Sequence, residues 1–391
     1  MNKITKIFAF TCAIFVAATV VVSAEGPTPR EDTQENKCET IAPKTNSFAW
    51  SKDPNVICPD DFYLRGELLL FMAQEEGLDY ALTNTENTPG NANGATFPLR
   101  GGTLHGFSTG SHDWRWNFGA RVNMGLFLNH DAWNLDVTWT RLYIKEDDNA
   151  SASNSAAIVG LFLPASSPLL GGNQLASARW KTKFATVDFS FGKPHHISPQ
   201  FILHPFAGFR GAWIDQDFVA RYSGIFMRTP TGVVTSMGTK MTGKNNMWGM
   251  GLRAGLTSEW FIGAGFNFFG NIAGSLLYGK HDVSQELPLF VNDAGVQTDH
   301  SYCIDQDFYD VMPNLELQFG LQWGKHLSDD SFRFSFRMAY EFHQWWHQNY
   351  FKRFMGDGTA IARNSFVATI KENTRGDLTF NGLSFGVLLD F

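Results

Sequence analysis

Apolar and polar residues alternate one by one along much of the chain. Between residues 114 and 128 (WRWNFGARVNMGLFL), every even position is apolar, whereas the odd positions include Arg115, Arg121 and Asn123. Because successive side chains of a β-strand point to opposite faces, this period of two predicts a strand with one apolar and one polar face. The alternation is equally clear at 132–143, 311–323 and 332–343. These stretches therefore predict strands and not helices.

Further stretches show the alternation more weakly and bring the number of predicted strands to ten. They are 62–72, 184–192, 201–214, 247–257, 260–272 and 377–391. Every second connection is short, at 129–131, 193–200, Ser258-Glu259 and 324–331. The others are long, at 73–113, 144–183, 215–246, 273–310 and 344–376. Short turns at one end and long loops at the other are typical of an up-and-down outer-membrane barrel.

Crossing a bilayer decides which face of these strands meets lipid. Strands that cross a membrane must satisfy their backbone hydrogen bonds between themselves, and only a closed barrel does so. The apolar face then meets lipid and the polar face lines the interior. A soluble β-sandwich would alternate too, but strands of up to about 15 residues are long for one, since about 5 or 6 is usual. The predicted fold is all-β: an antiparallel up-and-down transmembrane β-barrel with ten clear strands, short periplasmic turns and long extracellular loops.

Two of the long connections leave the strand count open. The segments 215–246 and 344–376 contain alternating pieces that could form further hairpins, which would raise the count to roughly 12 to 16. The last strand carries an apolar ladder that closes on the aromatic C-terminus: Leu383, Phe385, Val387, Leu389 and Phe391. This ending resembles the terminal-strand signal read by the barrel assembly machinery of outer membranes, which we therefore expect as a partner through Phe391.

The N-terminal segment predicts export from the cytoplasm. Lys3 and Lys6 precede an apolar run over residues 7–22, and small residues precede Glu25, which is the pattern of a secretory signal peptide. We expect a signal peptide at 1–24, a periplasmic extension at 25–61 and the transmembrane barrel at 62–391. After the signal peptide no run approaches the roughly 18 apolar residues of a spanning helix.

Composition, charge and cysteine content narrow the function. Charged residues make up 18% of the chain and aromatic residues 15%, an aromatic excess that a lipid-facing surface would explain. The net charge of −7 is scattered, and we expect no nucleic-acid partner because the basic residues do not cluster. The cysteines after the signal peptide are Cys38, Cys58 and Cys303. We expect Cys38 and Cys58 to pair, which leaves Cys303 as a buried free thiol or in an intermolecular bond.

Three stretches carry a resemblance to a known family. They are YLRGELLLFMAQEEGLDYAL (63–82), WRWNFGARVNMGLFLNHDAWNLDVTWTR (114–141) and HPFAGFRGAWIDQDF (204–218). The chain resembles the major-outer-membrane-protein-like porins of environmental chlamydiae and the related Legionella-type outer membrane proteins. The resemblance implies an abundant β-barrel porin of the bacterial outer membrane, with no enzymatic residues to carry over. The better-known chlamydial porins are usually richer in cysteine and have more strands, so a disulfide-crosslinked envelope is not implied.

The inward face of the predicted strands carries the candidate functional residues. By register they are Arg65, Glu67, Arg115, Arg121, Asp136, Asp188, Arg210, Arg253, Glu316, Arg333, Arg337 and Glu341. If they line a pore, seven Arg against five acids favour anions and small neutral solutes, because charged rings set selectivity through their local potential. The rival interpretation is that they pair across a narrow lumen and fill it, since a wide channel needs about 16 to 18 strands.

Several polar motifs predict other sites less strongly. The repeated pentapeptides IDQDF at 214–218 and 304–308 place paired aspartates at the outer rim, where they could hold a divalent ion, although solvated carboxylates are the favoured interpretation. His112-Asp113 with Asp215 and Asp217 would suit a surface protease of the omptin kind, but the flanking sequence does not match. His343 and His347 have a metal-ligand spacing for a helix, whereas in a strand they lie about 13 Å apart.

The predicted function is passive diffusion of small hydrophilic solutes and ions through an outer-membrane porin, with weak anion selectivity. The alternatives are a structural or adhesive surface barrel with a closed lumen and, below that, an omptin-like surface protease. We expect no enzymatic activity, no metal and no cofactor, and we expect outer-membrane lipids as partners. The oligomeric state stays open between a monomer and a homo-oligomer.

Overall fold

The computed structural model of the chain describes residues 62–84, 102–108, 115–128, 133–151, 157–163, 175–228, 234–293, 296–327, 332–356, 368–371 and 376–390. These ranges consist of strands and their connections, with no helix among them. Accordingly, this part of the chain has no helix that is long and apolar enough to cross a membrane. The predicted signal peptide, the periplasmic extension, the pair Cys38 and Cys58, His112-Asp113 and Phe391 lie outside the described residues.

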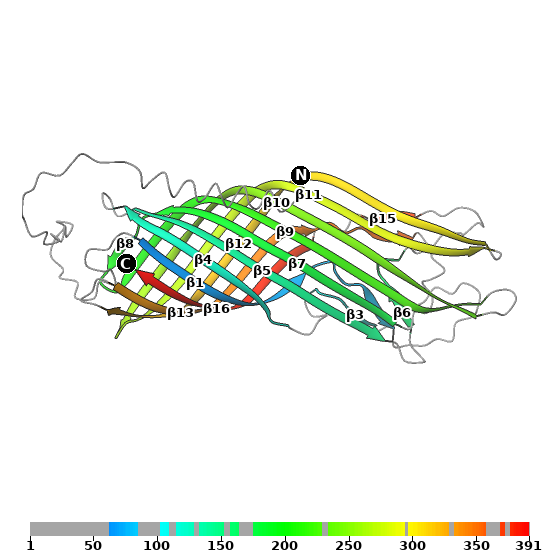
Figure 1. The fold of residues 1–391 in the computed structure, drawn as a ribbon, viewed down its shortest axis with the longest axis horizontal. Helices are drawn as coiled ribbons and strands as arrows, with labels where there is room; N and C mark the ends of the chain where they lie inside the picture. The colour runs from blue at the N-terminus through cyan, green and yellow to red at the C-terminus, as the bar shows by residue number, and fades with distance from the viewer. Residues whose placement is uncertain are drawn as a thin grey trace, which may run out of the picture. The chain divides into compact units, whose positions relative to one another are not determined.

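Ten antiparallel strands close into a barrel (Figure 1). They are β1 (Phe62–Glu75), β4 (Asn117–Leu128), β5 (Trp133–Ser151), β7 (Leu175–Gly192), β9 (Phe201–Arg228), β10 (Val234–Gly263), β11 (Phe266–Asp293), β12 (Val296–Leu327), β13 (Phe332–Asn349) and β16 (Gly376–Asp390). Each strand pairs with the next in this order, and β16 pairs with β1. The predicted fold class and the count of ten strands are thereby confirmed, although the predicted strand 260–272 contains the turn between β10 and β11.

The remaining strands lie outside the barrel. The short β8 (His195–Ser198) pairs with β9. A small sheet joins β3 (Gly102–His105), β2 (Ala81–Asn84) and β6 (Ala157–Gly160), and a separate pair joins β14 (Arg353–Gly356) to β15 (Ala368–Lys371). Within the described residues the long connections therefore add no strand to the barrel, and the count stays at ten. Residues 215–228 and 234–246 instead continue the β9–β10 ladder, with a register shift between Met237 and Gly238.

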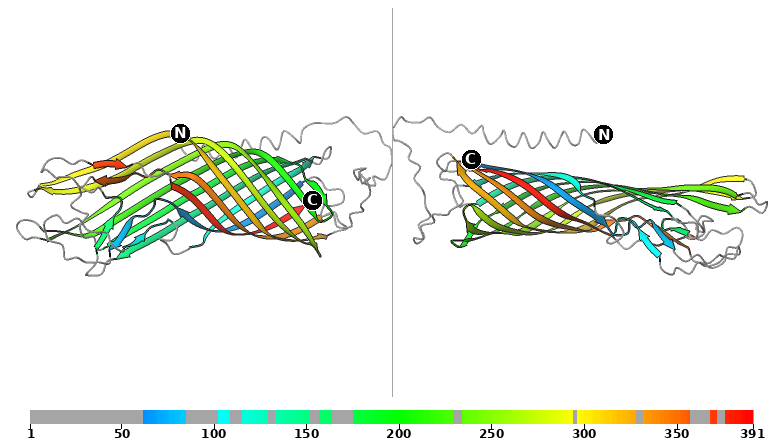
Figure 2. Two further views of the ribbon diagram at one scale, coloured as in Figure 1. Left: turned by 180° about the vertical axis from the view of Figure 1, so that it is seen from behind. Right: turned by 90° about the horizontal axis from the view of Figure 1, so that it is seen from below.

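The pairing register shows that the strands are inclined. When directly paired residues are followed from Tyr63 around the whole barrel, the path returns to β1 at Glu75, twelve residues further along the same strand. A closed sheet accommodates such a shift only if its strands are tilted relative to the barrel axis. Figure 2 shows this inclination from two further directions.

The hairpin between β10 and β11 turns at Ala264-Gly265, not at Ser258-Glu259 as predicted. Ala264 has a φ of 54° and Gly265 a φ of 82°, as a two-residue type I′ turn requires. Gly265 also accepts a hydrogen bond of 2.9 Å from the backbone N–H of Gly324. A Cβ at Gly265 would lie 2.3 Å from the Gly324 carbonyl oxygen. Glycine is therefore required here for two reasons.

The outward face defines an apolar band of membrane thickness. On β10 the exposed side chains run from Trp248 through Met250 and Leu252 to Trp260. From Trp248 to Trp260 the strand rises about 40 Å, or about 28 Å along the axis at a tilt of about 45°, which matches the apolar band of about 25 Å in outer-membrane barrels. Exposed aromatic residues mark the outer edge of the band on neighbouring strands: Tyr143, Trp213, Tyr278 and Tyr309.

Beyond this aromatic belt, β9 to β12 continue as an outer sheet. The belt residues are followed on the outward face by polar residues such as Asp217, Lys244 and Asp282. The inward face of the same segments is buried and carries both apolar residues and polar ones such as Gln216 and Asn245. Phe218 on this face contacts Phe107, Phe162 and Phe351. The inward face of the outer sheet is therefore covered by the segments that contain Phe107, Phe162 and Phe351.

Candidate functional site in the barrel lumen

Arg210 on β9 reaches across the lumen at the middle of the barrel. Its guanidinium donates two hydrogen bonds of 2.6 Å to the carboxylate of Asp188 on the adjacent β7. It also donates to Asn314 Oδ1 at 2.6 Å and to the Glu316 carboxylate, both on β12. Because β10 and β11 lie between β9 and β12, these bonds do not follow the sheet but cross the interior.

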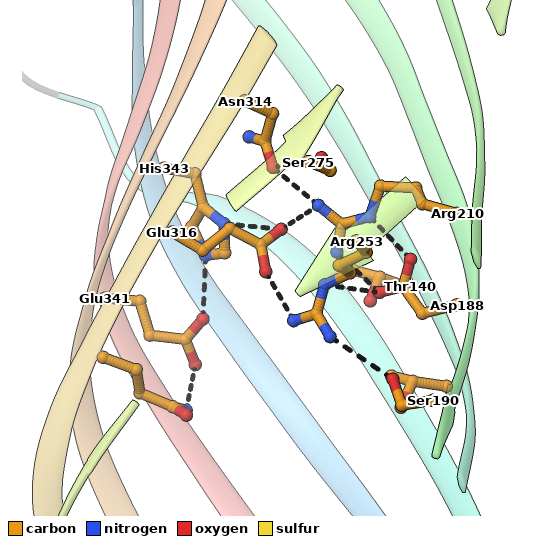
Figure 3. Close-up of polar contacts among 12 residues, drawn as sticks. Thr140, Asp188, Ser190, Arg210, Arg253, Ser275, Asn314, Glu316, Glu341 and His343 are labelled. Carbon is orange, nitrogen blue, oxygen red and sulfur yellow. Dashed lines mark hydrogen bonds and ion pairs between the residues drawn. The ribbon is translucent and has the colours of Figure 1, made fainter. Parts of the chain in front are cut away.

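A second guanidinium binds the same two carboxylates. Arg253 on β10 donates to Glu316 Oε2 at 2.8 Å, and its Nε lies 3.9 Å from Asp188 Oδ2. Figure 3 shows how Arg210 and Arg253 lie on either side of the Glu316 carboxylate. All four side chains are largely buried. Two cations and two anions thus neutralise one another away from bulk solvent.

Arg121 on β4 makes the equivalent crossing on the other side of the lumen. It forms a bidentate pair with Glu341 on β13, with N–O distances of 2.9 and 2.8 Å, and it contacts Glu67 on β1 at 2.7 Å. Both β1 and β16 lie between β4 and β13. Gln318 donates a further bond of 2.8 Å to Glu341, and Arg337 lies 3.8 Å from Glu67.

His343 connects the two groups into one network. Its Nε2 lies 2.9 Å from Glu341 Oε2 and its Nδ1 lies 3.6 Å from Glu316 Oε1. Figure 3 shows His343 bound to both Glu341 and Glu316. Glu341 belongs to the group around Arg121 and Glu316 to the group around Arg210. A continuous polar chain therefore runs from β4 to β9 through the interior, and we call it the lumen network.

Aromatic side chains fill the interior on the outer side of the lumen network. Phe184 contacts Trp345 with ring centroids 5.3 Å apart and Phe380 at 5.1 Å, and Trp345 also lies over the guanidinium of Arg210 at 5.7 Å. These side chains are buried. They join Phe218, beyond the belt, in one hydrophobic core. Apolar packing therefore occupies the interior on the outer side of the lumen network, in addition to the ion pairs.

The interior on the periplasmic side is polar instead. Asn123 donates a bond of 2.7 Å to Thr138, and Asn134 donates one of 3.0 Å to the hydroxyl of Tyr63. The Tyr63 hydroxyl in turn donates to Asp136. Some buried polar atoms here have no protein partner, among them Asn123 Oδ1 and Asn267 Oδ1. Buried polar atoms of this kind are typical sites for ordered water.

Comparison with known proteins identifies the family. The family model of the Legionella pneumophila major outer membrane protein precursor matches residues 69–391. The chain belongs to this Legionella-type outer membrane protein family. It is accordingly a β-barrel protein of the bacterial outer membrane. A comparison with curated proteins gives no match.

Solved structures similar to this family member are all distant. The outer membrane protease OmpT of Escherichia coli has a TM-score of 0.37 at 11% identity, covering 89% of this chain and 99% of its own. The toluene transporter TodX of Pseudomonas putida has 0.22 at 8% identity, covering 85% and 90%. A FadL homologue of Pseudomonas aeruginosa has 0.22 at 8% identity, covering 84% and 89%. Because these TM-scores lie below 0.5, the similarity gives no information on the function of this chain.

The predicted inward residues of this family member lie where their register places them, with one exception. Arg65, Asp136 and Arg333 face the interior nearer the periplasmic end, and Arg333 lies 3.9 Å from Asp390. Arg115 is the exception, since it precedes β4 and is half-exposed, 4.0 Å from Glu146. Whether any of these residues lines an open pore stays a prediction.

Three members of the lumen network are missing from the predicted site. Asn314, Gln318 and His343 have the inward parity of their strands and bind the charged residues directly. The prediction was restricted to Arg, Asp and Glu and therefore omitted them. The polar face of each strand was the signal that could have found them.

The predicted motifs at the outer rim point away from the lumen. Asp215 and Asp217 lie on the outward face of β9, between the buried Ile214, Gln216 and Phe218. Asp305 and Asp307 share the outward face of β12 with Asp282 of β11, and their carboxylates lie within 4.8 Å of one another. These three are exposed and Lys280 binds Asp307 at 2.6 Å, which agrees with solvated carboxylates.

Cys303 and His347 do not belong to the lumen network. Cys303 is a free and exposed thiol on β12, so of the two alternatives predicted for it, the buried thiol is wrong and the intermolecular bond stays a prediction. His347 has a φ of 59° at an irregularity in the β13–β16 pairing. It contacts Asp377 through its backbone N–H, whereas His343 binds Glu341 and Glu316. The two histidines therefore have separate surroundings.

Proposed function

We propose that this outer-membrane protein is a surface barrel whose lumen is closed and whose outer sheet is its working part, in a structural or adhesive role. The observation that carries the proposal is that Arg210 and Arg121 bind carboxylates of non-adjacent strands across the interior. A hydrated ion cannot pass where side chains from opposite walls are in direct contact.

The energetics favour a stably closed lumen. Separating a buried ion pair leaves an uncompensated charge and costs about 3 to 5 kcal/mol. Glu316 and Glu341 each bind more than one partner, so the network has to break at several points to open. The packing of Phe184 and Trp345 adds to this cost because their apolar surface is buried.

A second candidate function is passive diffusion of small hydrophilic solutes through a narrow pore. Its support is the polarity of the lumen network and of the periplasmic half. Replacing a buried ion pair by apolar residues is often neutral or stabilising, so an interior that serves only as a plug does not need charges. In this alternative the excess of Arg on the inward face gives weak selectivity for anions.

The proposal assigns the chain no enzymatic activity. The carboxylates of Asp188, Glu316 and Glu341 are bound by guanidinium groups or His343, which occupies the lone pairs that a general base would use. Asp215 and Asp217, the residues weighed for a protease, lie on the outward face of β9.

Planar-bilayer recording separates the two functions. The purified chain is folded in detergent, its folded state is verified by heat-dependent mobility in gel electrophoresis, and it is then inserted into a bilayer beside a wide porin as a positive control. We expect insertion without discrete conductance steps. Reproducible steps from the unaltered protein would overturn the closed lumen and support the pore.

A further inference from the structure

Four cationic side chains gather on the outward face of β5 and β7. Arg141 and Lys145 belong to β5, and Lys181 and Lys183 belong to β7. Their neighbours of opposite parity, such as Ile144 and Thr182, are fully buried. The cations therefore project outward from the sheet, and we call these four residues the basic cluster.

The pairing register brings like charges together. Lys145 is directly opposite Lys181, and Lys183 is opposite Tyr143, the residue between Arg141 and Lys145 on the same face. Like charges directly opposite each other destabilise an antiparallel pair. A sheet that keeps such an arrangement gains stability when an anion binds between the two charges.

Few carboxylates in the described part of the chain pair with the cations of the basic cluster. Among the described residues, Arg141, Lys181 and Lys183 form no ion pair within 4.0 Å, and Lys145 has only a 4.0 Å contact with Asp147, which already binds Arg179. Two further carboxylates face the cluster from β9, where Asp215 is opposite Lys183 and Asp217 is opposite Lys181. They reduce the local positive charge without forming those ion pairs.

The basic cluster lies at the outer edge of the apolar band. On β5, the interface residue Tyr143 lies within it, and Trp139 and Val137 precede it on the lipid-facing side. On β7, Val187 and Phe189 follow Lys183 on the same face. Tyrosine and tryptophan prefer the level of the lipid head groups. The four cations are thus placed where lipid phosphates lie, directly above the surface that acyl chains cover.

We propose that the basic cluster binds the phosphate groups of a phosphorylated saccharolipid in the outer leaflet of the membrane. The lipid is favoured over a free anion because the cluster continues directly into the apolar band, so one molecule contacts both. Basic side chains near an anionic membrane surface contribute about 1 kcal/mol each. The proposal does not depend on whether the lumen is closed.

Native mass spectrometry of the full chain tests the site. The protein is folded in detergent and titrated with lipid A, a diphosphorylated and acylated glucosamine disaccharide, and in parallel with the same lipid stripped of phosphate. We expect the unaltered protein to retain lipid A and to bind the stripped lipid far more weakly. Lys181→Gln/Lys183→Gln should weaken lipid A binding roughly 30-fold. If that variant does not fold, Arg141→Gln/Lys145→Gln replaces it.

The matched control is Lys240→Gln/Lys325→Gln, which removes the same charge at two exposed positions outside the cluster. We expect the control to bind lipid A as the unaltered protein does. Equal binding by the Lys181→Gln/Lys183→Gln variant, or equal binding of the stripped lipid, would overturn the proposal. Displacement of lipid A by inorganic phosphate alone, without an acyl chain, would reassign the cluster to free anions and would also overturn it.

Discussion

The guanidinium of Arg121 on β4 and the carboxylate of Glu341 on β13 form a bidentate pair across the lumen, with N–O distances of 2.9 and 2.8 Å. Two strands separate them within the sheet. A contact of this kind braces the barrel across its interior, in addition to the ladder bonds along its wall. It also makes each residue dependent on the other, because both are largely buried.

Replacing Arg121 by Met should destabilise the barrel strongly. The change leaves Glu341 and Glu67 without their shared cation in the interior, which costs about 3 to 5 kcal/mol. Guanidinium unfolding of the detergent-folded protein, followed by tryptophan fluorescence, measures the loss. Arg121→Lys keeps a charge but loses the bidentate geometry, so its loss should be smaller. Equal stability of the Met variant and the unaltered protein would contradict the role given to this pair.

Removing aromatic side chains from the lumen should open it. Phe184→Ala/Trp345→Ala deletes two buried rings on the outer side of the lumen network. Because Trp345 also packs against the guanidinium of Arg210, its loss admits water and frees Arg210 to leave its position across the lumen. We expect the double variant to conduct in a planar bilayer while the unaltered protein does not. Trp248→Ala, a change of similar size on the lipid-facing surface, serves as the control and should stay silent. Silence of the double variant in its folded form would mean that the lumen network alone closes the barrel.

The buried carboxyl of Glu75 should make stability depend on pH. Glu75 lies beyond the last apolar outward residue of β1, Met72, and burial raises its pKa to about 8 although Gln216 donates a bond that opposes the shift. Between the unperturbed pKa of 4.5 and about 8, the folded protein holds a proton that the unfolded chain has released. As the pH rises through this window, the free energy of unfolding therefore falls by about 1.4 kcal/mol for each pH unit.

Glu75→Gln should remove that dependence. We expect the variant to match the unaltered protein near the acidic end of the window and to exceed its stability above pH 8, where Glu75 would be charged. Unfolding curves at several pH values measure this difference. Glu76→Gln, at the exposed neighbouring position, should leave the original slope unchanged. A slope in Glu75→Gln equal to that of the unaltered protein would assign the pH dependence to another group.

The hairpin turn at Ala264 offers a stabilising substitution. Its φ of 54° is unfavourable for a residue with a Cβ, whereas glycine adopts it without a steric penalty. Ala264→Gly should therefore stabilise the barrel by about 0.5 to 1 kcal/mol after the larger entropy of the unfolded chain is subtracted. Ala264→Val should destabilise it, since a β-branched residue is strained at positive φ. The two variants changing stability in the same direction would contradict the turn geometry.

The free thiol of Cys303 reports the orientation of the outer sheet. Cys303 is exposed on the outward face of β12, beyond the aromatic belt. A membrane-impermeant maleimide should label it on intact cells, and Cys303→Ser should abolish that label. Labelling only after the outer membrane is broken would place the sheet on the periplasmic side and reverse the orientation predicted here.

The sequence predicted the transmembrane part of the fold well because membrane burial imposes one simple rule. Lipid outside and polar groups inside give a strict period of two, as in the stretch that contains Trp116 and Arg121. That period fixed the strands, their order and the face of each residue. The turn predicted at Ser258-Glu259 lies further along the chain in the structure. The alternation continues to Phe261, and the positive φ angles that the turn requires occur at Ala264 and Gly265.

The outer sheet was predicted as loops because its polar and apolar faces are exchanged relative to those of the transmembrane strands. Beyond the belt, the outward residues such as Asp217 become polar and the inward residues such as Phe218 become apolar. The apolar outward face that marks a transmembrane strand therefore ends where this exchange occurs. The pairing of Arg121 with Glu341 was equally out of reach, because it depends on the accumulated register around the closed sheet and not on any local pattern.

The unbroken course of β10 and β11 constrains how the protein is made. Each strand runs from the periplasmic hairpin through the apolar band into the outer sheet, with register shifts only near Phe261 and Met237. Chain segments that carry Lys244 and Asp282 must therefore be translocated through the bilayer before the final register can form. Biogenesis of this barrel thus includes moving charged segments of several strands across a hydrocarbon layer, a step whose barrier grows with every polar residue that the outer sheet displays.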